Sequence, residues 1–259
     1  MTQTKKFLSL ARETALEAGR VIMEVYRSGA FGQTLKPDES PLTQADSLSH
    51  STISRLLGKT GLPVLSEEGK DIEYRIRKDW TLFWLIDPLD GTKEFIARNG
   101  EFTVNIALVQ SNIAIAGVVY APALDRLYAG SRELGVYRTE KGNSTRLAPL
   151  AERCNYHELL QKEGLRVIAS RSHLSEDTSK FIARLRNCTL VRAGSALKFM
   201  SLVEDQADLY PRFSPTMEWD TAAAHAILNA SGRSICGADG QNELLYNKPS
   251  LVNPWFIAF

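Results

Sequence analysis

Residues 84–95 read WLIDPLDGTKEF, an apolar strand that runs directly into two carboxylates and then into a turn. The proline after Asp87 biases that residue toward an extended conformation, and the glycine after Asp90 lets the backbone approach a ligand closely. Carboxylate oxygens suit Mg²⁺, while a helix that opens at Thr92 would offer free N–H groups to an anion. This spacing predicts one pocket that binds a metal ion and a phosphate together.

The same residue types also occur in ordinary turns, because Asp, Pro and Gly dominate turns for conformational reasons. Further acidic residues at expected element boundaries favour the metal site. They are Asp46 in or near the first turn of a helix, Glu67 and Glu68 after an apolar run, and Asp220 at the start of a late helix. Carboxylates from several elements are what two or three divalent cations require. Asp220 could also be the N-cap of a helix from Thr221, and the two roles are compatible.

A second class of phosphatase shares part of this pattern. Haloacid-dehalogenase-type phosphatases carry a nucleophilic aspartate in an Asp-x-Asp-Gly-Thr motif. Here two residues separate Asp87 from Asp90, and the extra residue disrupts the register that a nucleophile and acid pair needs. Water activated by a metal ion is therefore preferred over an aspartyl-phosphate intermediate.

Composition excludes several classes of protein. A chain of 259 residues fits one large domain or two small ones, and 31 basic against 30 acidic side chains argue against nucleic-acid binding. Three cysteines without Cys-x-x-Cys spacing favour a reducing compartment and argue against structural zinc. Charged residues interrupt the N-terminal segment, so no signal peptide or membrane span is expected, and the expected location is the cytoplasm.

Hydrophobic periodicity predicts a helical start and a sheet-rich middle. Two amphipathic helices are expected before Gly58, and strand-like runs follow between Pro63 and Ala129. Ser111 and Asn112 are expected to form a hairpin turn between two of these strands.

After about Pro149 strands alternate with helices, two of which are expected to begin at Ser195 and Thr221. The apolar C-terminal hexapeptide is expected to form a final buried strand. The change of pattern predicts two closely packed subdomains, residues 1–149 and 150–259, with the acidic cluster between them.

Three motifs carry a resemblance to a known family: Glu67-Glu68, DPLDGT at 87–92 and WDTAA at 219–223. With them the chain resembles, over essentially its whole length, the inositol monophosphatase superfamily of Mg²⁺-dependent, lithium-sensitive phosphatases. Within that superfamily, residues 92–95 and 99–108 and the YPRF segment are similar to bacterial CysQ-type 3'(2'),5'-bisphosphate nucleotidases. The resemblance implies an α/β (α+β) fold, a layered αβαβα sandwich of the inositol monophosphatase and fructose-1,6-bisphosphatase type.

The resemblance also implies which residues bind the cations. Glu67, Asp87 and the carbonyl of Leu89 would hold one Mg²⁺. Asp87, Asp90 and Asp220 would hold a second, and Glu67 would also touch a third ion where one is present.

A catalytic set follows from the same resemblance. Thr92, polarised by Asp46 and helped by Glu67, would orient the metal-bound water for in-line attack on a 3'-phosphate. The N–H groups of Gly91 and Thr92 would cradle that phosphate. The expected products are AMP and inorganic phosphate.

Substrate specificity is expected to lie in the second half. The segment from Gly194 through Ser195 to Lys198 places a helix N-terminus and a lysine where the other phosphate of a nucleotide could bind, and Arg212 is a further candidate. The full set of expected substrate contacts is Glu67, Leu89, Asp90, Gly91, Thr92, Gly194, Ser195, Lys198, Arg212 and Asp220.

The leading hypothesis is a cytoplasmic, Mg²⁺-dependent phosphatase of sulfur assimilation that acts on adenosine 3',5'-bisphosphate. One alternative is an inositol or sugar phosphatase of the same superfamily, and the other is a non-catalytic regulator that binds a nucleotide or metal. The resemblance leaves open a monomer or a weak dimer, and also a peripheral contact with the cytoplasmic face of the inner membrane.

Overall fold

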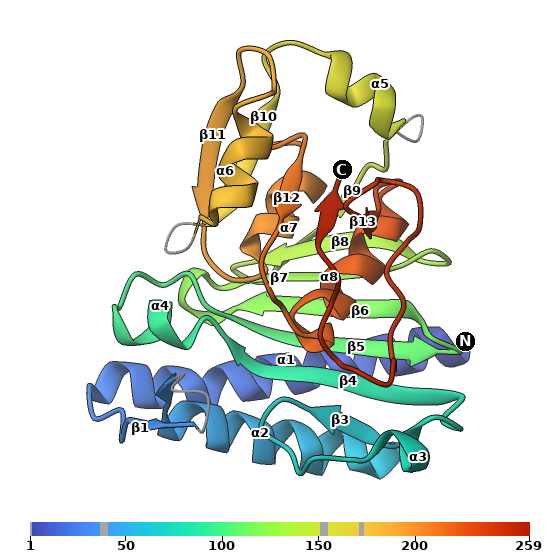
Figure 1. The fold of residues 1–259 in the computed structure, drawn as a ribbon. Helices are drawn as coiled ribbons and strands as arrows, with labels where there is room; N and C mark the ends of the chain where they lie inside the picture. Colours follow the sequence, from blue (N-terminus) through green and yellow to red (C-terminus); the bar gives the residue numbers. More distant parts are fainter. Residues whose placement is uncertain (1, 37–40, 151–154, 171–173) are drawn as a thin grey trace.

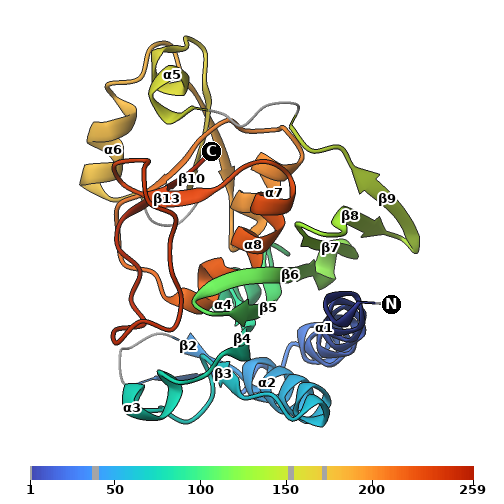
Figure 2. The same ribbon diagram turned by 90° about the vertical axis from the view of Figure 1, so that its right-hand side faces the viewer.

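The protein folds into alternating layers of helices and sheets (Figures 1 and 2). The structure, a computed structural model, describes residues 2–36, 41–150, 155–170 and 174–259. Its α-helices are α1 (Gln3–Ser28), α2 (Gln44–Leu57), α3 (Tyr74–Arg77), α4 (Thr92–Ile96), α5 (Tyr156–Gln161), α6 (Glu176–Ile182), α7 (Leu197–Val203) and α8 (Glu218–Ala230), and two 3-10 helices are η1 (Gly58–Thr60) and η2 (Pro122–Leu124). Its strands are β1 (Thr34–Leu35), β2 (Pro41–Leu42), β3 (Val64–Ser66), β4 (Leu82–Asp90), β5 (Thr103–Gln110), β6 (Ile113–Ala121), β7 (Arg126–Ser131), β8 (Gly135–Glu140), β9 (Asn143–Leu147), β10 (Arg166–Ser170), β11 (Thr189–Ala193), β12 (Tyr210–Arg212), β13 (Ile235–Gly237) and β14 (Phe256–Ala258).

A seven-stranded sheet forms the centre of the first half, with its strands in the order β3-β4-β5-β6-β7-β8-β9. β3 pairs parallel to β4, and every later pair is antiparallel. The predicted turn at Ser111 and Asn112 is confirmed: both residues have positive φ, 45° and 69°, as a two-residue hairpin turn requires. β8 and β9 were not predicted, because their mostly polar, partly exposed residues lack an apolar alternation.

Helices cover both faces of this sheet. Alternate residues of β4 face opposite sides: Trp84 and Ile86 pack with α1 and α2, whereas Phe83 and Leu85 pack with α7 and α8. Figure 2 shows α1 and α2 on one side of the sheet and α7 and α8 on the other. Residues 221–229 of α8 are all buried, which fits a helix enclosed between two sheets.

Beyond α7 and α8 lies a second sheet layer. β10 pairs parallel to β11, and β12, β14 and β13 form an antiparallel set in that order. A parallel bridge between Val167 and Leu209 joins the two groups. α5 and α6 form the outermost layer (Figure 2), where they pack on this sheet through residues such as Leu159 and Ile182. The predicted α/β fold with αβαβα layering is confirmed.

Three details of the second half differ from the sequence predictions or extend them. The helix expected from Ser195 begins at Leu197, because Ser195 has a φ of +50° that interrupts a helix. The helix expected from Thr221 begins at Glu218, so Asp220 is its third residue and not its N-cap. The C-terminal segment forms the predicted buried strand, β14, which lies in the middle of its three-stranded sheet. The proposed division at residue 149 stays a prediction.

Within the described residues, each helix is too short or too polar to span a lipid bilayer.

Gly117 on β6 should be sensitive to any side chain, because a Cβ there would overlap the backbone carbonyl of Ala223 on α8. We expect Gly117→Ala to lower the free energy of unfolding by about 1–3 kcal/mol, measured by urea denaturation. Gly58→Ala is the matched control: nothing lies within 4 Å of its Cβ position and its φ of −57° suits alanine. Equal stabilities of the two variants would contradict the close packing of α8 on β6.

Candidate active site

β4 delivers two of the predicted carboxylates to the same place. In a regular strand Asp87 and Asp90 would point to opposite faces, but the pairing of β4 with β5 shifts register between them. Asp87 is 1% exposed, and its carboxylate accepts a hydrogen bond from the amide of Leu89 at 3.1 Å. The irregularity therefore lets both aspartates face the side of the sheet where α8 begins.

Glu67 and Asp220 reach this place from neighbouring elements. Glu67 follows β3, and its amide donates to the carbonyl of Ile86 at 3.2 Å, which sets it beside Asp87. Asp220 lies in the first turn of α8, where its carboxylate accepts from the amide of Met217 at 2.8 Å. Carboxylate oxygens of Glu67, Asp87 and Asp220 lie within 4.8 Å of one another, so three of the predicted metal ligands converge.

Crowding of these acids changes their protonation. Burial raises the pKa of Asp87 well above its usual range, and the charges of Glu67, Asp90 and Asp220 add to the effect. Burial, together with the charges of Asp90 and Glu67, raises the pKa of Asp220 to about 8. Carboxylates placed this close cannot all ionise unless a cation compensates their charge.

The donor set fits Mg²⁺. Glu67, Asp87 and Asp220 offer hard carboxylate oxygens, and Asp90 lies close enough for its charge to raise the pKa of Asp87 and Asp220. Such oxygens suit Mg²⁺, whereas zinc and copper sites usually include histidine or cysteine. Lys36 already supplies one positive charge at the edge of the cluster: its amine pairs with Glu67 at 2.7 Å and also with Glu68. Burial lowers the pKa of Lys36, but the two glutamates outweigh it and hold that pKa above its usual range.

Asp46 and Thr92 lie next to the cluster and contact each other. Helix α4 opens at Thr92 as predicted, and the Thr92 hydroxyl donates to Asp46 Oδ1 at 3.1 Å and to the carbonyl of Leu89 at 3.4 Å. The other oxygen of Asp46 accepts from the amide and hydroxyl of Thr43 at 2.7 and 2.6 Å, which caps α2. Burial raises the pKa of Asp46, while its hydrogen bonds act in the opposite direction.

Asp90 has partners that the sequence did not reveal. Its Oδ2 accepts from Ser195 at 2.6 Å, from Asn105 at 3.3 Å and from Thr103 at 3.5 Å. Thr103 and Asn105 are buried on β5, where two polar residues at alternate positions of an otherwise apolar strand are the signal that could have found them. The amide of Gly194 likewise donates inside the protein, to Glu101 at 2.8 Å. Of these two predicted substrate contacts, Ser195 therefore holds a carboxylate of the site, and Gly194 holds Glu101.

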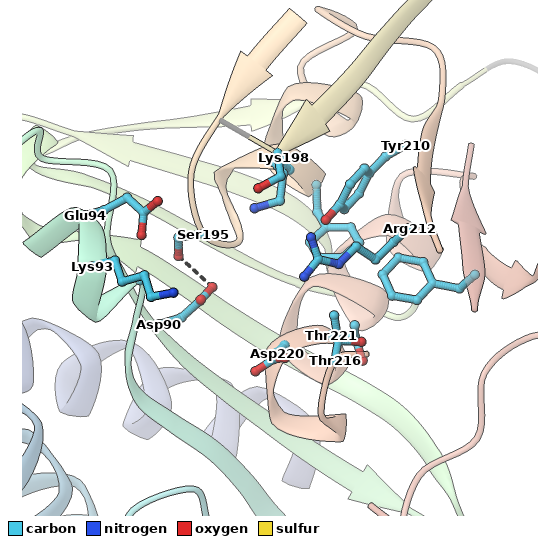
Figure 3. A pocket seen from close by; sticks show the side chains of 14 residues that line it. Asp90, Lys93, Glu94, Ser195, Lys198, Tyr210, Arg212, Thr216, Asp220 and Thr221 are labelled. Atoms are coloured by element: carbon cyan, nitrogen blue, oxygen red, sulfur yellow. Dashed lines mark hydrogen bonds between the residues drawn. The ribbon is translucent and has the colours of Figure 1, made fainter. Parts of the chain in front are cut away.

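A cavity of about 180 Å³ opens beside Asp90 and Asp220. Figure 3 shows the side chains of Lys198 and Arg212 on its other side, pointing toward the two aspartates. Burial lowers the pKa of Lys198, whose amine lies 5.8 Å from the ring centre of Tyr210. Nε of Arg212 is buried and, within the described residues, has no hydrogen-bond partner. This end of the cavity is thus built to receive an anion.

Gly91 leaves room for the backbone to approach a neighbouring group closely, as the sequence predicts. It has a φ of +91°, and a Cβ there would lie 3.3 Å from both the carbonyl of Glu101 and the Cβ of Ser195. All predicted site residues of the second half except Gly194 line the same cavity as Asp90 and Gly91; they are Ser195, Lys198, Arg212 and Asp220.

Comparison with known proteins identifies the family. The family model described as the inositol monophosphatase family matches residues 3–255. The chain belongs to the inositol monophosphatase family. A solved structure of CysQ from Bacteroides thetaiotaomicron, a bacterial member of that family, aligns with a TM-score of 0.86 and 41% identity, covering 99% of this chain and 97% of that one. The IMPase of Thermotoga maritima, with a TM-score of 0.77 and 20% identity over 98% of this chain and 91% of that one, shares the fold.

Curated relatives refine the comparison. The 3'(2'),5'-bisphosphate nucleotidase CysQ of Salmonella typhimurium is 40% identical over 250 residues, which are 94% of this chain and 96% of the relative. The CysQ of Buchnera aphidicola is 36% identical over 98% of this chain and 94% of the relative. The predicted resemblance to the CysQ-type members of the superfamily is confirmed.

The metal-free protein should lose stability as pH rises, because the pKa of folded Asp220 is raised from an ordinary 3.8 to about 8. Its protonated form is favoured in the folded state, so the stability it contributes is present below about pH 4 and is lost as pH rises toward 8. We expect Asp220→Asn, in excess EDTA, to unfold at a higher temperature than wild type at pH 8 and at a similar one near pH 4. At pH 8 the free energy of unfolding of Asp220→Asn should exceed that of wild type by at least about 1 kcal/mol, the free energy of roughly one pKa unit.

Asp71→Asn, at an exposed aspartate, is the control and should show no such dependence. A wild-type protein as stable as Asp220→Asn at pH 8 in EDTA would contradict the electrostatic account of the cluster.

Proposed function

We propose that the protein is a Mg²⁺-dependent phosphatase that removes the 3'-phosphate of adenosine 3',5'-bisphosphate and releases AMP and inorganic phosphate. The observation that carries the proposal is the cluster of Glu67, Asp87 and Asp220, beside a cavity in which Asp90 and Asp220 face the side chains of Lys198 and Arg212. Curated relatives named 3'(2'),5'-bisphosphate nucleotidase, at 36–40% identity over nearly the whole chain, support the nucleotide as substrate.

The ligand set for two or three Mg²⁺ ions consists of Glu67, Asp87, the carbonyl of Leu89, Asp90 and Asp220. When bound, the cations would neutralise the phosphoryl oxygens and lower the pKa of a water molecule. Ser195, Thr103 and Asn105 hold the Asp90 carboxylate in one orientation, so that few rearrangements accompany binding.

Thr92 and Asp46 orient the attacking water. The Thr92 hydroxyl donates its hydrogen bond to Asp46 at 3.1 Å, so the lone pairs of its oxygen can accept a hydrogen bond from the attacking water. Glu67 helps Thr92 to orient that water. The start of α4 at Gly91 and Thr92 supplies backbone N–H groups to the phosphate under attack.

Lys198 and Arg212 would bind the second phosphate. A buried lysine with a lowered pKa and an arginine with an unused N–H gain most from a doubly charged ligand. Inositol 1-phosphate carries no second phosphate for them, which ranks an inositol phosphatase below a nucleotidase. A purely binding regulator would not need the Thr92–Asp46 hydrogen bond beside the carboxylates.

The wider setting follows from the same proposal. We assign the protein to the cytoplasm and to sulfur assimilation, and we expect lithium to inhibit it. For its oligomeric state, the proposal includes both a monomer and a weak dimer. Near-balanced charge supports a small-molecule substrate over nucleic acid. A peripheral contact with the cytoplasmic face of the inner membrane remains part of the proposal.

Substrate choice is tested by phosphate release in Mg²⁺ from adenosine 3',5'-bisphosphate, inositol 1-phosphate and fructose 1,6-bisphosphate in parallel. We expect a strong preference for the nucleotide in wild type. Asp90→Asn, like Asp87→Asn, should abolish release while circular dichroism stays unchanged, because each removes negative charge and keeps shape. Preference for the inositol or sugar phosphate would reassign the substrate, and near-normal turnover by Asp90→Asn would overturn the metal site.

Recognition of the second phosphate is tested with a truncated substrate. Lys198→Met should lower kcat/KM for adenosine 3',5'-bisphosphate by about 10- to 100-fold, since a hydrogen bond to a charged group contributes about 1.5–3 kcal/mol. The variant should change kcat/KM for adenosine 3'-monophosphate, which lacks the 5'-phosphate, by much less. Lys180→Met, at an exposed lysine paired with Glu176, is the matched control and should alter neither value. Equal losses on both substrates with Lys198→Met would show that Lys198 does not recognise the second phosphate.

A further inference from the structure

Glu218, the first residue of α8, is a fully buried carboxylate with 0% exposure. It stands two residues before Asp220. Burying an ionised carboxylate is costly unless its oxygens are all paired. The cost of burying its carboxylate indicates that Glu218 has a specific role at this position.

Both oxygens of Glu218 are paired by one loop, residues 245–250. Oε2 accepts from the amide of Asn247 at 2.5 Å, while Oε1 accepts from the amide and the amine of Lys248 at 3.0 and 2.5 Å. Asn247 has a φ of +61°, a backbone conformation that asparagine tolerates better than most residues. The loop is thus shaped to hold this carboxylate.

Arg77 ties the same loop to the seven-stranded sheet. It is 3% exposed and ends α3, within the connection that leads from Glu67 to β4. Its guanidinium donates to the Asn247 side chain at 2.8 Å and to the carbonyls of Lys248 and Pro249 at 2.6 and 3.0 Å. The Asn247 amide group returns a bond to the carbonyl of Arg77 at 2.7 Å. Figure 2 shows the red C-terminal loop reaching α3.

The chain just after this loop grips the start of α8 from the other side. The amide of Glu218 donates to the carbonyl of Leu251 at 2.9 Å, and the Asn253 side chain donates to the carbonyl of Met217 at 2.7 Å. Met217 in turn donates its amide to Asp220. These hydrogen bonds connect the loop, and the chain that follows it, to Asp220 through the first turn of α8.

Arg77, Asn247 and Glu218 are here called the clamp. We propose that the clamp positions Asp220 relative to the carboxylates of the sheet and so sets the affinity of the site for divalent cations. Mg²⁺ demands near-ideal octahedral geometry, so a small displacement of one ligand weakens binding. None of the three residues is among the described residues that line the cavity, which makes them positioning residues. This inference rests on the proposed metal site.

The test measures direct binding of Mn²⁺, followed by electron paramagnetic resonance of the free ion, and needs no turnover. Glu218→Gln keeps the shape of the side chain, but its amide N–H group would face the backbone N–H donors of Asn247 or Lys248. We expect it to bind Mn²⁺ about tenfold more weakly than wild type, as loss of a group that orients a metal ligand typically does. Glu243→Gln is the matched control, because Glu243 pairs with Asn229 near the other end of α8, at 3.2 Å. It should leave the affinity unchanged even where it lowers the unfolding temperature.

The outcomes separate the two proposals. No Mn²⁺ binding by wild type would overturn the metal site itself. Binding by wild type with unchanged affinity in folded Glu218→Gln, or an equal loss in Glu243→Gln, would overturn the clamp. If Glu218→Gln does not fold, Lys248→Met provides the test: the Lys248 side chain is 27% exposed, and its amine gives Glu218 one of the three hydrogen bonds that the carboxylate accepts. A loss of Mn²⁺ affinity smaller than that expected for Glu218→Gln would support the clamp. An unchanged Mn²⁺ affinity in Lys248→Met would contradict it.

Discussion

Mutual repulsion among carboxylates is the constraint on which this structure depends. Glu67, Asp87 and Asp220 come from three separate elements to within 4.8 Å, with Asp90 close enough to raise the pKa values of two of them. Folding must hold these groups together although, without a cation, they favour being apart or protonated. A divalent cation bound by these residues, as proposed, would compensate their charge and stabilise the folded protein.

The architecture supplies the force that holds the cluster together. Parallel pairing of β3 with β4 sets Glu67 beside Asp87, and the register shift in β4 turns Asp90 to the same side. α8 is pressed so closely on β6 that only glycine fits at position 117. Beyond the cluster the charge changes sign, because Lys198 and Arg212 face the acids across the cavity. Under the proposed function, the phosphate under attack and the second phosphate are bound at opposite ends of this one pocket.

Much of the site could be predicted because it is local in sequence. The proximity of Asp87, Asp90, Gly91 and Thr92 follows from one strand and one turn. Asp46 and Asp220 could be singled out by their positions at expected helix starts, and the family resemblance supplied their roles. The αβαβα layering also followed from that resemblance. What could not be predicted depends on distant partners: the engagement of Ser195 by Asp90, the polar pair Thr103 and Asn105, and the link from Arg77 to Glu218 across about half of the chain. The start of α8 at Glu218 was missed because the buried pairing of that residue with Asn247 and Lys248 is invisible in local propensity.

Anomalous diffraction from crystals grown with Mn²⁺ and adenosine 3',5'-bisphosphate would reveal both the cation sites and the positions of the two phosphates. We expect anomalous peaks among the oxygens of Glu67, Asp87, Asp90 and Asp220, with the 3'-phosphate at these ions and the 5'-phosphate at Lys198 and Arg212. Absence of any anomalous peak among these carboxylates, at a Mn²⁺ concentration that supports turnover, would contradict the proposed metal site.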